Sequence, residues 1–197
     1  MIEQIIQKYL QRGQFRKAQN LLENLGKKGS DNLSLFFYLG KVYYELNDHK
    51  KSVFYFRKCN QMKPYNHKIL FNLAQVLQGL GKINETKKIY EKLIRQNPND
   101  IRSYYGLFNL SIKNINSEYL KKLQILSNDN KISLFHKSLI NFIFSKVKKS
   151  ENKIIEELKF LELSHRQCFQ SNTNFNEQSE FYYNQIITKN YNKIKFE

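Results

Sequence analysis

The two prolines of this 197-residue chain, Pro64 and Pro98, lie 34 residues apart, and this spacing constrains the fold more than any other feature. When the sequence is aligned on these prolines, six earlier positions hold residues of similar size and polarity in each period. Ahead of Pro64 these are Phe36, Leu39, Gly40, Tyr43, Ser52 and Phe56, and ahead of Pro98 they are Leu70, Leu73, Ala74, Leu77, Thr86 and Tyr90. One period earlier stand Ile2, Ile5, Ile6, Tyr9, Ala18 and Leu22. A period of roughly 20–50 residues is typical of a solenoid in which each repeat packs on its neighbours.

The apolar spacing within each period predicts a pair of α-helices. We expect helices at about 1–12 and 14–27, 33–46 and 49–62, 67–80 and 83–96, and 101–113 and 116–127. Each proline follows the second helix of a pair, where its missing N–H ends the helix. Asn66 and Asp100 then stand where they can cap the next helix. Gly40 is expected to face Ser52 and Cys59, because paired helices approach closely only where small side chains meet.

The fourth period is degenerate, since Phe108 and Leu120 occupy positions where small residues are expected. Beyond it, apolar spacing predicts helices at about 131–148 and 151–169, and a last one that begins near Phe175 and ends near Tyr191. The predicted organisation is a repeat region at 1–134, divided at about 1–32, 33–66, 67–100 and 101–134. Residues 135–197 form a helical region that caps the apolar end of the solenoid.

Composition supports an all-α fold. The chain has 7 Gly and 2 Pro, too few turn formers for many short strands, and its 41% of hydrophobic residues argues against general disorder. No apolar run is long enough to span a membrane, and residues 1–4 lack the basic start of a signal peptide, so we expect a cytoplasmic protein with no membrane partner. The oligomeric state is not predicted.

The formal net charge of +16 favours nucleic acid, anionic membranes or acidic peptides as partners. Residues 1–134 carry 23 basic and 10 acidic groups, whereas 135–197 carry 10 and 7. The abundant Lys, Asn, Ile, Phe and Tyr all have A/T-rich codons, so genomic base composition is an alternative explanation for this charge.

The sequence predicts no catalytic residues, no metal site and no cofactor. It contains no glycine-rich phosphate loop, and its four histidines do not combine with a nucleophile and a carboxylate into a triad. His165 and Cys168 have a spacing compatible with two metal ligands, but no second pair accompanies them. We therefore expect a chain that is not an enzyme.

The 34-residue pattern resembles the tetratricopeptide repeat (TPR), a helix–turn–helix unit of the same period. The resemblance is carried by Phe36, Leu39-Gly40, Tyr43, Ser52, Phe56 and Pro64, and it recurs across about residues 1–100. It implies an all-α solenoid of helical hairpins in which the first helix of each repeat lines a concave face. The implied function is non-catalytic binding of a protein or peptide.

The resemblance also implies which residues line that concave face: Phe37, Tyr38, Lys41, Tyr44, Lys68, Phe71, Asn72, Gln75, Arg102, Tyr105 and Asn109. Amides, aromatic rings and cations suit an extended peptide that carries carboxylates. Lys41, Asn72 and Arg102 resemble the set with which some TPR proteins hold a C-terminal carboxylate. The chain departs from that set at Phe37 and Gly106, where the family has a Lys and an Arg.

Two alternatives stay open. The first is nonspecific nucleic-acid binding through the basic surface. The second comes from a looser resemblance to the N-terminal TPR half of bacterial TPR–sulfotransferase proteins, carried by Glu157-Leu158, Leu161, His165 to Phe169, Phe181 to Tyr183 and Ile186-Ile187. That resemblance implies a polypeptide whose domain for the sulfonate donor PAPS is missing from this chain.

Overall fold

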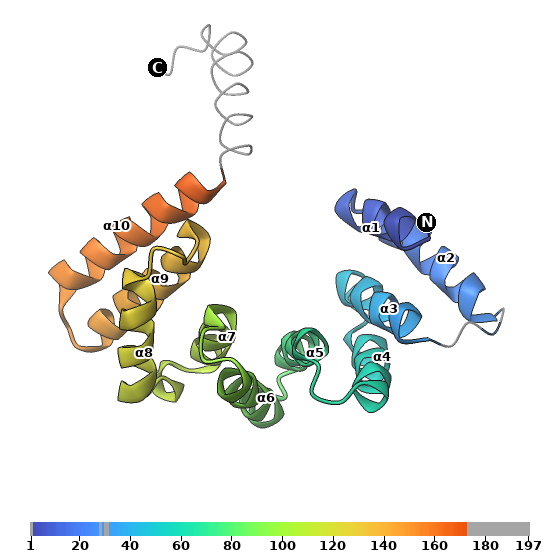
Figure 1. Ribbon diagram of the computed structural model, residues 1–197, viewed down its shortest axis with the longest axis horizontal. Coiled ribbons are helices and arrows are strands. Elements are labelled where there is room, and N and C mark those ends of the chain that lie inside the picture. The colour runs from blue at the N-terminus through green and yellow to red at the C-terminus, as the bar shows by residue number, and fades with distance from the viewer. Residues whose placement is uncertain (1, 28, 30–31, 173–197) are drawn as a thin grey trace, which may run out of the picture. The chain divides into compact units, whose positions relative to one another are not determined.

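The structure is a computed structural model that describes residues 2–27, 29 and 32–172, and the regular structure of these residues is entirely helical (Figure 1). The first seven α-helices are α1 (Ile2–Gln11), α2 (Phe15–Lys27), α3 (Leu33–Glu45), α4 (His49–Met62), α5 (His67–Gly79), α6 (Ile83–Gln96) and α7 (Ile101–Leu110). A 3-10 helix at Ile112–Asn114 precedes α8 (Ser117–Asn128), α9 (Leu134–Ser150) and α10 (Ile154–Ser171). The predicted all-α fold is confirmed. The helix predicted between Phe175 and Tyr191 lies outside the described residues.

The chain divides into two compact units, Met1–Ser111 and Ile112–Glu197. The division falls inside the predicted fourth repeat, because α7 belongs to the first unit and α8 to the second. The sequence placed the domain boundary after residue 134, and that boundary stays a prediction.

The first unit consists of three helical hairpins, α1–α2, α3–α4 and α5–α6, followed by α7. Within it, α3 contacts α5 and α5 contacts α7, so these first helices form one row and α4 and α6 lie on its other side (Figure 1). Hydrogen bonds join neighbouring hairpins: Gln7 Nε2 donates to Tyr38 Oη at 3.0 Å, and Tyr43 Oη donates to Glu23 Oε1. The bond from Tyr43 lowers the pKa of the Glu23 carboxyl.

The turn inside each hairpin has one residue in the left-handed region. These residues are Gly13, Asn47 and Gly81, with φ of 66°, 60° and 69°. They are one 34-residue period apart, and Gly and Asn tolerate this conformation best. The next position in the register is Ile115, a β-branched residue for which the left-handed region is unfavourable. The hairpin turn is replaced there by the 3-10 helix, which explains why the repeat fails at this point.

The close crossing of α3 and α4 depends on Gly40, as predicted. Ser52 Oγ donates to the Gly40 carbonyl at 2.7 Å, and a Cβ at Gly40 would lie 2.9 Å from the Phe56 ring. Cys59 takes a different place, with its Sγ 3.7 Å from the Leu33 carbonyl. Phe56 therefore fills the space opposite Gly40 that we had expected Cys59 to share.

Side-chain caps begin most of the helices after α2. Asn66 caps α5 as predicted, since its Oδ1 accepts from the Ile69 N–H at 3.1 Å. Asp100 stands at the start of α7 but makes no side-chain cap. Its carboxylate instead accepts from Ser103 Oγ and lies 2.8 Å from His67 Nε2, so it joins α7 to α5.

In the second unit, α9 and α10 form an antiparallel hairpin. Ser164 Oγ donates to the Ser138 carbonyl at 2.8 Å, and Asn141 Nδ2 donates to Gln167 Oε1 at 2.8 Å. Ile140 and Ile143 of α9 are fully buried. The opposite side of α10 is exposed and partly apolar, with Ile154, Ile155, Leu158 and Phe169.

Candidate functional site

We define the inner surface as the faces of α3, α5 and α7 that carry the predicted concave-face residues, and most of these residues on α3 and α5 line a central or an N-terminal cavity. The central cavity has a volume of about 210 Å³. Four of the predicted residues line it: Lys41 and Tyr44 from α3, and Asn72 and Gln75 from α5. Positions that are 31 residues apart in sequence, such as Lys41 and Asn72, are thus brought together by the stacking of two repeats. Glu45, Phe56 and Val76, which are outside the predicted set, complete its wall.

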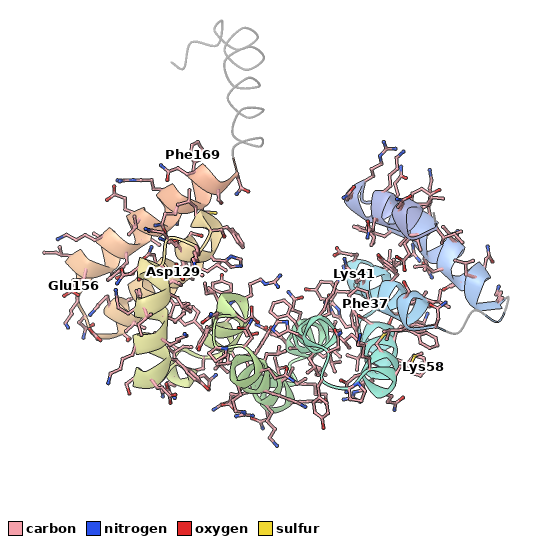
Figure 2. All side chains as sticks on the ribbon, in the orientation of Figure 1. Phe37, Lys41, Lys58, Asp129, Glu156 and Phe169 are labelled. Atoms are coloured by element: carbon pink, nitrogen blue, oxygen red, sulfur yellow. The ribbon has the colours of Figure 1, made fainter. Side chains whose placement is uncertain are left out.

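The N-terminal cavity is larger, about 390 Å³, and includes Phe37, Tyr38 and Lys68 from the predicted set. Phe37 and Tyr38 are each only 9% exposed, so they form its wall rather than project from the surface. The other lining residues, which the sequence did not predict, are Glu3, Leu33, Ser34, Lys63, Asn66 and Ile69. Figure 2 shows Phe37 and Lys41 on α3, with Lys58 apart from them on α4.

Two cations of the inner surface lie over aromatic rings in the same way, one repeat apart. Lys68 Nζ is 4.9 Å from the centroid of the Phe37 ring, and the Arg102 guanidinium is 5.1 Å from that of Phe71. One period earlier the equivalent residues are Glu3 and Ser34, and Ser34 Oγ donates to Glu3 Oε1. The fifth residue of one repeat, counted from its start at 33 or 67, therefore contacts the second residue of the next repeat. Only the stacking of repeats reveals this pairing, because no single repeat contains both partners.

Arg102 has a nearby carboxylate that the sequence argument did not include. Its Nε lies 4.0 Å from Asp100 Oδ1, and Asp100 is buried. Arg102 is not among the residues that line the central cavity with Lys41 and Asn72. The predicted Lys41, Asn72 and Arg102 set is therefore divided between the cavity and the Phe71 pair.

At position 106 this chain has a glycine where some TPR proteins have an Arg, and the difference has a steric cause. A Cβ at this position would lie 2.4 Å from Cζ of Tyr90, which is fully buried in the preceding repeat. The Arg that some TPR proteins have here cannot be accommodated without moving Tyr90. Of the remaining predicted residues, Tyr105 is half-buried beside Phe108, with ring centroids 6.3 Å apart, and Asn109 is exposed.

Within the described part of the chain, no group of three or more His, Cys, Asp or Glu side chains could hold a metal ion. His165 is exposed and Cys168 is half-buried on α10. None of the helices in the described residues has the length and apolarity needed to cross a membrane.

The two cysteines should react very differently with an alkylating agent. Cys59 is fully buried, and burial raises the pKa of its thiol to about 12, so the reactive thiolate is scarce at neutral pH. We expect iodoacetamide at pH 8 to modify native protein at Cys168 long before Cys59, and urea to make both reactive. Mass spectrometry of tryptic peptides measures this, and early labelling of Cys59 would show that the α3–α4 crossing opens readily.

The tetratricopeptide repeat family matches residues 33–66 and 67–100, the same boundaries that the proline register predicts. DnaJ homolog subfamily C member 3 of Gallus gallus is 32% identical over 88 residues, which are 45% of this chain. The match spans 17% of that relative's length.

Three solved structures share the fold at low sequence identity. MamA from Desulfovibrio magneticus RS-1 has a TM-score of 0.63 at 18% identity, over 84% of this chain and 94% of its own. A Podospora anserina protein with nearly identical TPR-like repeats has 0.66 at 13%, over 87% and 95%. BtubC from P. vanneervenii has 0.65 at 14%, over 84% and 78%. Residues 33–66 and 67–100 are therefore tetratricopeptide repeats, and the stacked hairpins give the chain the fold of a TPR-like helical solenoid.

Proposed function

We propose that the inner surface binds an extended, acidic segment of a partner protein. TPR folds generally serve as protein-interaction modules and are typically non-catalytic. This general role agrees with the expectation, drawn from the sequence, that the chain is not an enzyme. The observation that carries the finer proposal is the central cavity, where Lys41 and Tyr44 of one repeat meet Asn72 and Gln75 of the next.

These side chains suit a peptide backbone flanked by carboxylates. The amides of Asn72 and Gln75 can each donate to a backbone carbonyl and accept from a backbone N–H. The Lys41 ammonium can donate to a carboxylate, and such charge-assisted hydrogen bonds are among the stronger ones. The neighbouring N-terminal cavity contains Lys63 and Lys68 against the single acid Glu3, so it adds positive charge to the same surface, whereas Glu45 balances Lys41 in the central cavity.

The proposal is tested by titrating the chain with a fluorescein-labelled peptide rich in Asp and Glu, and with its Asn/Gln counterpart. We expect the acidic peptide to bind more tightly, and Lys41→Glu to weaken it by about tenfold or more, because a charge-assisted hydrogen bond becomes a repulsion. Lys58→Glu on α4 makes the same charge change away from the inner surface and should bind like wild type. Equal loss in both variants would show a general charge effect and contradict the proposal.

Arg102→Gln provides a second readout at the inner surface. It removes the charge over Phe71 without placing a new carboxylate beside Asp100, as Arg102→Glu would. We expect weaker peptide binding here too, but by less than for Lys41→Glu, because Asp100 already offsets the charge of Arg102. The sulfotransferase and nucleic-acid alternatives stay predictions, and no contact described above favours either of them over peptide binding.

A further inference from the structure

The basic charge of the first unit lies mainly on the second helix of each hairpin. By their Lys, Arg, Asp and Glu residues, α2, α4 and α6 carry formal charges of +2, +4 and +2. The first helices α1 and α3 are neutral, and α5 and α7 carry +1 each. Since α4 has no acidic residue at all, its solvent-facing side is the most basic helical surface of the unit.

That side of α4 also exposes large apolar residues. Lys51, Phe54, Lys58 and Met62 follow one another at spacings of three or four residues, which places them on one face of α4. Tyr65 lies in the turn that follows this helix, and we call the five residues together the outer stripe. Phe54, Met62 and Tyr65 are 53%, 51% and 65% exposed. Phe56 of the same helix is only 1% exposed and belongs to the core. The helix α4 therefore buries one apolar face and exposes another.

Two cations, Lys58 of the outer stripe and Lys92 of the neighbouring α6, lie close to aromatic rings. Lys58 Nζ lies between two of them, 4.8 Å from the Phe36 centroid and 4.9 Å from that of Phe54. Lys92 of α6 lies 3.9 Å from the Tyr65 ring. Among the described residues, no carboxylate forms an ion pair with Lys58 or Lys92. These ammonium groups therefore remain available to an external anion.

We propose that the outer stripe docks on the surface of a lipid bilayer that contains anionic lipids. Phe54, Met62 and Tyr65 enter the boundary between headgroups and acyl chains, while Lys58 and Lys92 pair with lipid phosphates and carboxylates. Lys51, whose Nζ lies 3.4 Å from Asp48 Oδ2, adds positive charge beside them. This is attachment at the surface, and it is compatible with the lack of a membrane-spanning helix among the described residues. The expectation of no membrane partner rested on spanning segments, which surface attachment does not need.

Single-stranded nucleic acid is the competing polyanion, and the geometry favours it less. Such ligands stack their bases on open aromatic faces. Here Lys58 lies over one face of Phe54 and Lys92 over one face of Tyr65, and Met62 offers no ring. Three exposed apolar side chains among cations match the composition of membrane-surface sites instead.

The test is co-sedimentation of the full chain with vesicles. One set contains phosphatidylserine and phosphatidylcholine at about three to seven, and the other contains phosphatidylcholine alone. We expect binding to the first set only. Phe54→Ser with Met62→Ser, which leaves the charge unchanged, and Lys51→Glu with Lys58→Glu should each weaken binding by about tenfold or more.

The control is Lys41→Glu with Lys68→Glu, which makes the same charge change on the inner surface and should keep more of its vesicle binding than the outer charge variant. Equal losses in the two charge variants would overturn the proposal, as would wild-type binding by the Phe54 and Met62 variant. The proposal would also be overturned if the chain bound a single-stranded RNA oligonucleotide tightly and the Phe54 and Met62 variant bound it equally well. That result would show that the basic surface binds nucleic acid. Since the peptide assay uses inner-surface variants, either proposal can fail while the other stands.

Discussion

Replacing Gly106 by alanine is expected to lower the free energy of unfolding of the first unit by about 1–3 kcal/mol. The added Cβ would lie 2.4–2.8 Å from three atoms of the Tyr90 ring, well inside van der Waals contact. Tyr90 has little freedom to move, because it is fully buried, packs edge to face against Phe71 and donates from its Oη to Gln78 Oε1 at 3.3 Å. Relief of the overlap therefore requires α7 to shift away from the preceding repeat.

The measurement is urea unfolding followed by circular dichroism, with Gly79→Ala as the matched control. Gly79 also lies in a helix, but the atom nearest to a Cβ there would be His49 Nε2 at 3.5 Å, an ordinary contact. Because alanine favours a helix by up to about 1 kcal/mol over glycine, Gly79→Ala should be neutral or stabilising. If Gly106→Ala were as stable as Gly79→Ala, the close approach of α7 to Tyr90 would be wrong.

The Phe56→Ala substitution is expected to cost more, about 3–5 kcal/mol. Phe56 is 1% exposed, fills the space opposite Gly40 and packs edge to face on Phe37 with ring centroids 5.7 Å apart. Removing the ring leaves a cavity at the crossing of α3 and α4, which the rigid helices can close only in part. Because Phe56 also lines the central cavity, peptide binding should weaken together with stability.

Phe54→Ala is the control for this prediction, since it removes the same ring from the same helix. Phe54 is 53% exposed, so we expect its loss to change stability by no more than about 0.5 kcal/mol. Equal destabilisation by the two substitutions, measured in the same urea unfolding experiment, would show that the register of α4 is wrong. The contrast also matters for function, because Phe54→Ala leaves the core intact and can be used in vesicle binding.

The site was predictable in part. Lys41, Tyr44, Asn72 and Gln75, which the 34-residue register assigns to successive first helices, line one cavity, because each repeat stacks on the next in the same way. It did not show that Phe37 and Tyr38 are mostly buried, or that Asp100 lies beside Arg102. Burial and ion pairing depend on the neighbouring repeat, and a pattern within one repeat does not contain that information.

The sequence by itself determined the positions of the helices and of the repeat boundaries. The proline spacing, the apolar periodicity and caps such as Asn66 located the ten described α-helices and the repeat boundaries at 33–66 and 67–100, since these features act over a few residues. They did not show that the helix predicted at 101–113 ends at Leu110 and is followed by a 3-10 helix. Only the tertiary structure decided how the repeats meet. It selected Phe56 as the partner of Gly40, excluded a side chain at Gly106, and placed Lys92 of α6 over the exposed ring of Tyr65. Each of these outcomes depends on the distance between helices, which is set by packing across the whole unit.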